Sequence, residues 1–190
     1  FRNAIIVMTS NVGADIIKRG QSLGFAVPRD EDESASRDYD EMRKKVMEHA
    51  HRRLMVRVNA LGSGYNQDDL QAIVGASPTG IMLPKVESVE HVREIHERLL
   101  GCERHGGMQP GSLGVVALIE SARGVQHIFR ILSEAIEPAR AFLAAFGAAD
   151  YSLDMGIDLS RDGAELHYPR SRIAVASRAA GREPPIDTPF

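Results

Sequence analysis

The chain has 190 residues, 43% hydrophobic and 26% charged, a balance typical of a globular protein of about one domain. The net charge of −3 is too small for the basic surface with which proteins bind nucleic acid or anionic membranes. The single cysteine, Cys102, excludes an intrachain disulfide and fits a cytoplasmic protein. No apolar run approaches the roughly 18 residues of a membrane helix, and the chain does not start with a signal peptide. We therefore expect no nucleic-acid or membrane partner.

Residues 1–53 form the first of two parts that differ in pattern. The apolar run at residues 4–8 predicts a buried strand. Helices are expected at residues 12–19 and 37–52, from capping residues and apolar spacing respectively. The acidic segment between these helices predicts a solvated loop.

Residues 54–190 alternate apolar strand-like runs with amphipathic helices. Strands are expected at residues 55–60, 80–84, 113–119, 141–147 and 185–188, and helices at 68–74, 89–100, 122–136 and 169–180. This alternation indicates an α/β fold with a parallel sheet. Such folds keep their chemistry at the carboxyl ends of the strands.

Two carboxylates follow apolar strands directly, Glu120 after residues 113–119 and Asp150 after residues 141–147. If the two strands are neighbours, both side chains reach one cation. Two oxygen ligands with room for water suit Mg²⁺. The alternative is that each carboxylate caps the helix that follows it.

Other polar residues also lie at predicted strand ends. Arg57 and Asn59 alternate with valines and so share one face of their strand. A buried Arg57 needs an anionic partner, either a substrate carboxylate or an aspartate. Lys85 ends the next strand, where a surface position is the usual one, and Asp154 is read first as a helix cap or as a residue that supports Asp150.

The remaining chemistry-bearing residues form no recognised site. The seven histidines lack the spacing of a zinc site, and no nucleophile elbow, dinucleotide-binding turn or Walker A loop is present. Cys102 has no evident catalytic partner.

Residues 55–190 carry, in order, six segments that together resemble the citrate lyase β-subunit and HpcH/HpaI aldolase family of magnesium-dependent carbon–carbon lyases. The segments are VRVN at 56–59, GIMLPKVES at 80–88, ALIESARG at 117–124, FGAADYSLDMG at 146–156, YPRSR at 168–172 and PIDT at 185–188.

The resemblance implies a TIM-type barrel with Mg²⁺ bound by Glu120 and Asp150. It implies that Arg57 is the catalytic contact to the acyl group, and we expect Asn59 and Lys85 to bind substrate beside it. Substrates of the family are 3-hydroxyacyl thioesters of coenzyme A or of an acyl carrier, such as citryl, malyl or citramalyl thioesters. Their cleavage builds an enolate, whose charge a metal ion and a cationic side chain stabilise.

The chain departs from the family pattern in three places. Ala149 stands where the family usually has glutamate, and the expected opening strands before Arg57 and the last strand and lid after Phe190 are missing. Both ends therefore look cut, and the lyase part supplies about five of the eight strands of a barrel. We expect a partial barrel or an open parallel sheet, with impaired activity. The homo-oligomer of the intact lyases is not assured here.

Residues 1–52 resemble a different family, the second ATPase module of Clp-type AAA+ unfoldases. The matching segments are FRNAIIVMTSNVGA at 1–14, LGF at 23–25 and YDEMRKKVM at 39–47. The resemblance makes Asn11 a vestigial nucleotide sensor and predicts a chimeric chain with a boundary between residues 53 and 54. Without Walker motifs and an arginine finger, ATP hydrolysis is not expected.

The two resemblances leave three further possibilities. The strand in residues 4–9 covers one edge of the lyase sheet, or residues 1–52 act as an inactive segment that binds Clp-type rings. Alternatively, exposed sheet edges prevent a stable fold.

Overall fold

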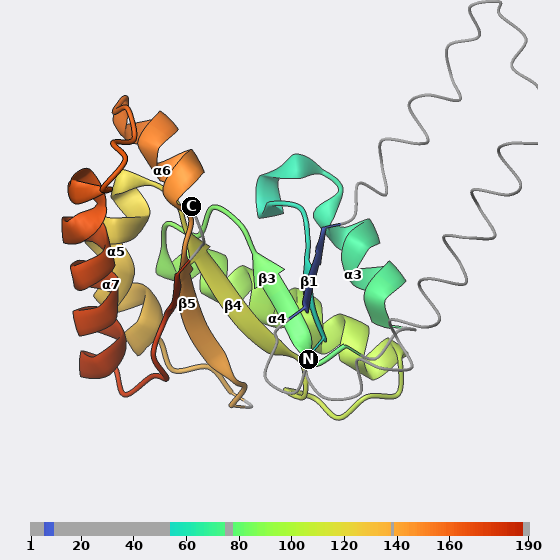
Figure 1. Cartoon of the computed structure of the whole chain (residues 1–190). Coiled ribbons are helices and arrows are strands. Elements are labelled where there is room, and N and C mark those ends of the chain that lie inside the picture. Colours follow the sequence, from blue (N-terminus) through green and yellow to red (C-terminus); the bar gives the residue numbers. More distant parts are fainter. Residues whose placement is uncertain (1–5, 10–53, 75–77, 138, 188–190) are drawn as a thin grey trace, which may run out of the picture.

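The protein is seen in a computed structural model that describes residues 6–9, 54–74, 78–137 and 139–187 (Figure 1). The described strands are β1 (Ile6–Thr9), β2 (Leu54–Arg57), β3 (Gly80–Leu83), β4 (Gly114–Ile119), β5 (Phe142–Phe146) and β6 (Ile186–Asp187). The described helices are η1 (Leu61–Ser63), α3 (Asn66–Val74), α4 (Val89–His105), α5 (Ala122–Ser133), α6 (Ala148–Met155), η2 (Ala164–Leu166) and α7 (His167–Ala179). No helix among these residues is long and apolar enough to cross a membrane.

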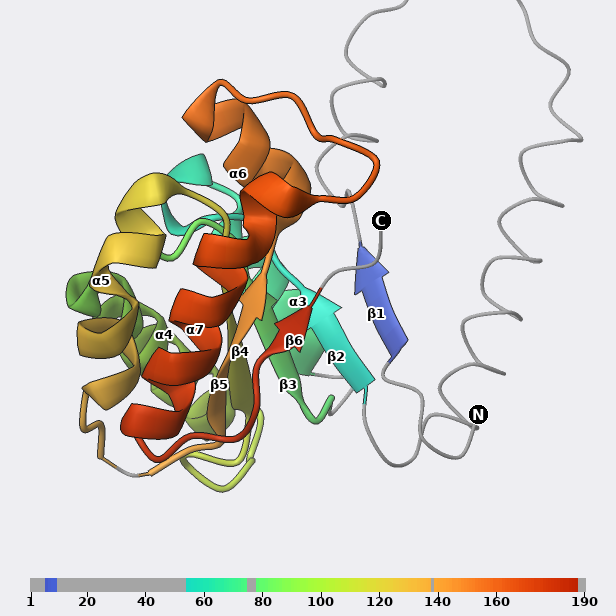
Figure 2. The same cartoon turned by 60° about the vertical axis from the view of Figure 1, so that its left-hand side comes forward.

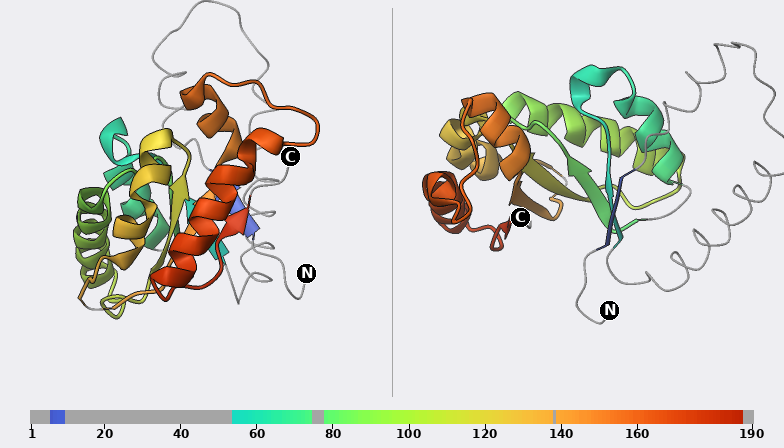
Figure 3. Two further views of the ribbon diagram at one scale, coloured as in Figure 1. Left: turned by 90° about the vertical axis from the view of Figure 1, so that its left-hand side faces the viewer. Right: turned by 45° about the horizontal axis from the view of Figure 1, so that its top comes forward.

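The strands form one parallel sheet in the order β1-β2-β3-β4-β5-β6, so each strand pairs with its neighbours in sequence. The sheet curves, and α3, α4, α5 and α7 follow one another along its convex side (Figures 1 and 3). This is the right-handed strand–helix–strand arrangement of a barrel that has been only partly built. Strands β2–β6 are the five lyase-like strands expected, and β1 covers the β2 edge (Figure 2).

Apolar side chains leave the sheet alternately toward its two faces. In β4, Val115, Ala117 and Ile119 belong to the large core under the helices. Val116 and Leu118 belong to a smaller cluster on the other face. All six residues of β4 are buried, because both faces of this strand are covered.

Strands β3 and β4 begin at a close approach between two glycines. Gly80 is paired with Gly114, and a Cβ atom on Gly80 would lie 2.3 Å from the Gly114 carbonyl oxygen. Only glycine at residue 80 allows the two backbones to lie so near each other.

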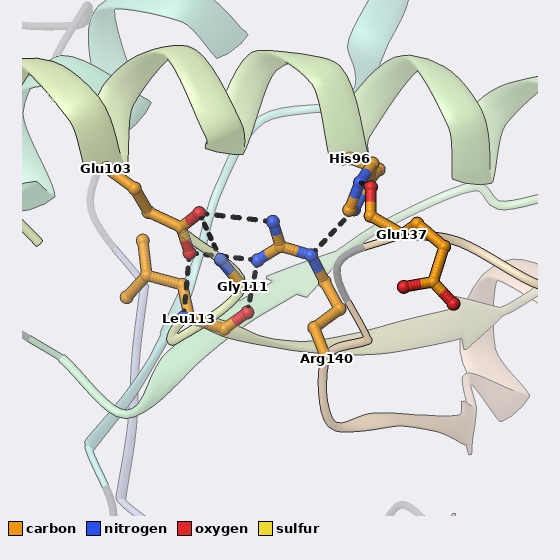
Figure 4. Close-up of polar contacts among 6 residues, drawn as sticks. All are labelled: His96, Glu103, Gly111, Leu113, Glu137 and Arg140. Carbon is orange, nitrogen blue, oxygen red and sulfur yellow. Dashed lines mark hydrogen bonds and ion pairs between the residues drawn. The ribbon is translucent and has the colours of Figure 1, made fainter. Parts of the chain in front are cut away.

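A buried ionic network lies at the amino end of β4 and β5 (Figure 4). The Arg140 guanidinium pairs with the Glu103 carboxylate at 3.0 Å, and both side chains are fully buried. Arg140 Nε donates to His96 Nδ1 at 2.9 Å, and Glu103 accepts the N–H groups of Gly111 and Leu113. The network joins α4 to the residues that lead into both strands.

Several elements differ from the sequence prediction. Strand β2 ends at Arg57 rather than at residue 60, because the Asn59 N–H bonds to the Asp69 carboxylate instead of a strand. Helix α4 runs on through Gly101 to His105, since its last turns still bury Leu99 and Cys102.

Helix α6 was not predicted at all between the expected strand at 141–147 and helix at 169–180. Tyr151 packs edge-on against Phe146 at 5.4 Å between ring centroids, and Gly156 ends the helix with a φ of 64°. The helices predicted at 12–19 and 37–52, and the acidic loop, lie outside the described residues.

Candidate active site

Glu120 follows the last residue of β4 and has only 3% of its surface exposed. Its Oε1 accepts a hydrogen bond of 2.9 Å from the backbone N–H of Lys85, in the loop after β3. Glu120 does not cap the helix that follows it, since Ser121 Oγ fills that position and accepts from the Gly124 N–H. The carboxylate therefore links two neighbouring strand ends.

Lys85 contributes its main chain to this site. Its φ of 56° is the only positive value among the described non-glycine residues. This left-handed conformation, which costs a lysine about 1 kcal/mol or more, turns the N–H toward Glu120. Lys85 itself is exposed, and the substrate contact expected of its ammonium group stays a prediction.

Asp150 reaches Glu120 from the adjacent strand. Strand β5 pairs with β4, and Asp150 is the third residue of the helix that follows β5. Gly147 lies between the two strand ends and allows them to come this close, because a Cβ atom on residue 147 would lie 2.8 Å from Glu120 Oε2. The condition set from the sequence, that the two strands be neighbours, is met.

The two carboxyl groups interact directly. Burial, followed by the negative charge of Asp150, raises the pKa of Glu120 to about 7. The Lys85 N–H and the charge of Arg57 oppose this rise but do not cancel it. The side-chain contact with Asp150 raises the pKa of Glu120 further.

Arg57 ends β2, two strands from β4, and is half-buried. Its positive charge is close enough to lower the pKa of Glu120. Among the described residues, none forms an ion pair with Arg57. The contact to the acyl substrate expected of Arg57 stays a prediction.

Asn59 lies with helix α3 rather than with the carboxylates. Its backbone N–H and its side-chain NH₂ both donate to Asp69 Oδ2, at 2.7 and 2.9 Å. Its carbonyl oxygen accepts from the side chain of Asn66. These bonds hold the loop after β2, and a substrate contact by Asn59 stays a prediction.

Asp154 is a helix cap, as the sequence suggested, but it caps a different helix from its own. Its Oδ2 accepts the N–H of Ala122, the first residue of α5, at 2.8 Å. Asp154 lies one turn after Asp150 in α6, so α6 is tied to the helix that follows Glu120.

Nothing else in the described part of the chain competes as a metal site. It contains no group of three or more His, Cys, Asp or Glu side chains placed to hold an ion.

A cavity of about 320 Å³ lies between α3 and α4 and contains neither Glu120 nor Asp150. It is lined by Gln67, Gln71, Gly101, Cys102, His105 and Gly106. Burial raises the pKa of the Cys102 thiol, which makes it a poor nucleophile. Asn11, the predicted nucleotide sensor, lies outside the described residues.

The family model described as HpcH/HpaI aldolase/citrate lyase matches residues 25–184, most of the chain. The chain belongs to this family. The citrate lyase subunit beta of Escherichia coli K12 is 35% identical over 172 residues, which cover 84% of this chain and 56% of that protein.

Solved structures match the architecture of this chain. RipC from Yersinia pestis matches with a TM-score of 0.58 and 27% identity, over 80% of this chain and 64% of that one. Protein CitE from Mycobacterium tuberculosis, in complex with magnesium, acetoacetate and coenzyme A, matches with a TM-score of 0.54 and 31% identity. That match covers 70% of this chain and 45% of CitE. The α/β fold with a curled parallel sheet is therefore that of citrate lyase β subunits.

The matches also show how much of the relative this chain covers and where the family match begins. The chain spans about half the length of the citrate lyase subunit that it matches. The family match begins at residue 25, inside the segment that resembles an AAA+ module, and the comparisons give that resemblance and the chimera no support.

Proposed function

We propose that the chain is a magnesium-dependent carbon–carbon lyase that cleaves 3-hydroxyacyl thioesters. In this proposal Glu120 and Asp150 are the metal ligands. One observation carries the proposal. Two carboxyl groups from neighbouring strand ends meet at the carboxyl edge of the sheet, and one is buried with a pKa raised to about 7.

The chemistry of this pair fits a divalent cation. Two carboxylates in contact repel each other unless a proton or a cation lies between them. Carboxylate oxygens are hard ligands, and Mg²⁺ keeps several waters, so two protein ligands suffice where substrate oxygens complete the set. Bound Mg²⁺ would polarise the substrate oxygens and stabilise developing negative charge.

The protein's own residues supply the remaining functions. The Lys85 N–H holds Glu120 in place at 2.9 Å, so that this ligand needs no rearrangement to bind. We assign to the Arg57 guanidinium, whose charge lowers the pKa of Glu120, the role of binding the acyl carboxylate or carbonyl of the thioester. Asn59 and Lys85 remain further candidate substrate contacts, as the family resemblance suggests.

Substrate and partner follow from the relatives rather than from this site. The M. tuberculosis protein was solved with magnesium, acetoacetate and coenzyme A. We extend the thioester class to this chain, with coenzyme A or an acyl carrier as the partner and the cytoplasm as the location.

A thermal melt with and without Mg²⁺ tests the metal site first. Mg²⁺ at a concentration of ten times its Kd stabilises the folded state by about 1.4 kcal/mol. This raises the Tm by about 3–6 °C for a chain of this size. Asp150→Ala should abolish the shift. Asp158→Ala, which removes an exposed carboxylate from the loop after α6, is the matched control and should keep it. Equal Tm values for the wild type with and without Mg²⁺ would contradict the metal site.

Activity is tested separately with citramalyl-CoA and malyl-CoA. We expect release of the cleaved thioester, and Glu120→Ala should remove it, because the remaining carboxylate cannot hold the ion alone. Turnover that persists in Glu120→Ala would contradict the assigned roles even if Mg²⁺ binds.

The domain boundary between residues 53 and 54 remains a prediction, as does the vestigial role of Asn11. Deletion of residues 1–53 tests the boundary. A lyase unit that starts at residue 54 should keep the Mg²⁺-dependent rise in Tm, whereas loss of that rise would place part of the lyase fold before the boundary.

A further inference from the structure

We propose that Asp154 is a positioning residue for the metal site, holding helix α6 against the start of helix α5 so that Asp150 and Glu120 stay in contact. The inference rests on the proposed magnesium site. It assigns to an exposed aspartate, outside the ligand pair, control over the affinity of that site.

The connection is short on both sides. Asp154 Oδ2 accepts the Ala122 N–H at 2.8 Å. Ala122 lies two residues after Glu120, and Asp154 lies four residues after Asp150, on the same face of α6. One hydrogen bond thus links the helix that carries Asp150 to the start of the helix that follows Glu120.

Helix α6 relies on this bond at its far end, where Leu153 and Met155 are exposed. It has eight residues, and its N-cap, Gly147, makes no side-chain capping bond. An isolated helix of this length is not stable, so tertiary contacts decide where it lies. Tyr151 anchors the first turns on Phe146, and Asp154 anchors the last turn on α5.

The same bond also suits the start of α5. Ala122 presents one of the unpaired N–H groups of the first helical turn, and a carboxylate is favoured there by the helix dipole. Ser121 satisfies the N–H of Gly124 at 3.1 Å. A simple capping role for Asp154 therefore has to be separated from a role in metal binding.

Four variants make that separation. Asp154→Ala removes the acceptor and the charge, whereas Asp154→Asn keeps an oxygen acceptor without the charge. Ala122→Pro removes the donor and leaves the carboxylate unchanged. Proline is well tolerated at a first helical position, and Ser121 already has the extended backbone, φ −145° and ψ 158°, that a residue before proline adopts. Ala122→Ser keeps the N–H and serves as the control.

The measurement is the Kd of each full-length variant for Mg²⁺ by calorimetry, with a thermal melt to show that each is folded. We expect Asp154→Ala and Ala122→Pro to bind about tenfold more weakly, as is typical when a residue that supports a metal ligand is removed. Asp154→Asn and Ala122→Ser should stay within about threefold of the wild type.

The outcomes are distinct. A residue that only caps α5 would lower the Tm and leave the Kd unchanged, so wild-type affinity in folded Ala122→Pro overturns the inference. Affinity in Asp154→Asn as weak as in Asp154→Ala also overturns it, since charge rather than the bond would then be responsible. A wild type that binds no Mg²⁺ overturns the proposed metal site itself.

Discussion

The raised pKa of Glu120 makes this residue a source of pH dependence. The unfolded chain releases the Glu120 proton near pH 4.5, whereas the folded chain holds it until about pH 7. Protonated Glu120 therefore stabilises the fold fully below pH 4.5, and this contribution is lost as the pH rises through 7. The difference corresponds to about 3 kcal/mol.

Glu120→Gln tests this directly, because glutamine keeps the shape and the acceptor oxygen but cannot ionise. Without Mg²⁺, the variant should melt at the same temperature as the wild type at pH 4.5 and several degrees higher at pH 8. With Mg²⁺ at pH 8, the wild type should gain stability and the variant should not. A wild type whose Tm rises between pH 5 and 8, relative to the variant, would contradict the raised pKa.

The proximity of Glu120 and Asp150 could be predicted from the sequence, because both carboxylates follow apolar strand runs and parallel strands end at a common edge. The contribution of Lys85 could not. Sequence reasoning considers the lysine side chain, whereas the structure uses its backbone N–H in a left-handed conformation that residue type does not reveal. Asn59 was likewise assigned from strand alternation, which stops at Arg57.

Among the helices and strands, apolar periodicity predicts an element correctly where one of its faces is buried along its whole length. Strands β3, β4 and β5 and helices α5 and α7 lie close to their predicted positions, because each has an apolar run or face long enough to detect. Helix α6 was missed because eight residues beginning with two alanines carry little periodic signal. Helix α4 was ended too early because Gly101 resembles a terminator, whereas packing of the following turn outweighs about 1 kcal/mol of glycine cost.

Two glycine substitutions test how tightly the elements are joined. Gly147→Ala, between β5 and α6, places a Cβ 2.8 Å from Glu120 Oε2, so it should cost about 1–3 kcal/mol and weaken Mg²⁺ binding. Gly101→Ala, in the middle of α4, meets nothing within 4 Å and should instead stabilise the fold by about 0.5–1 kcal/mol. Urea denaturation of both variants gives the two values. Equal stabilities would mean that the β5–α6 junction tolerates movement of Glu120.

At the scale of the whole molecule, the two ends of β4 and β5 serve different purposes. The buried Arg140–Glu103 pair joins α4 to the residues before these strands, and Glu120 and Asp150 follow them. Barrel folds separate stability at the amino end from chemistry at the carboxyl end in this way. Strand β4 has six residues, so the two ends lie roughly 20 Å apart.

That separation predicts that stability and metal binding respond independently. Glu103→Gln leaves the Arg140 guanidinium buried without its counter-charge, which should cost about 3–5 kcal/mol and lower the Tm by roughly 10 °C or more. Sites this far apart have nearly additive effects on stability. The variant should therefore keep the wild-type Kd for Mg²⁺ when measured at a temperature where it is folded, and the same Mg²⁺-dependent rise in Tm. A change of Kd would mean that the two ends are coupled along β4 and β5, and that the half-barrel responds as a single mechanical unit.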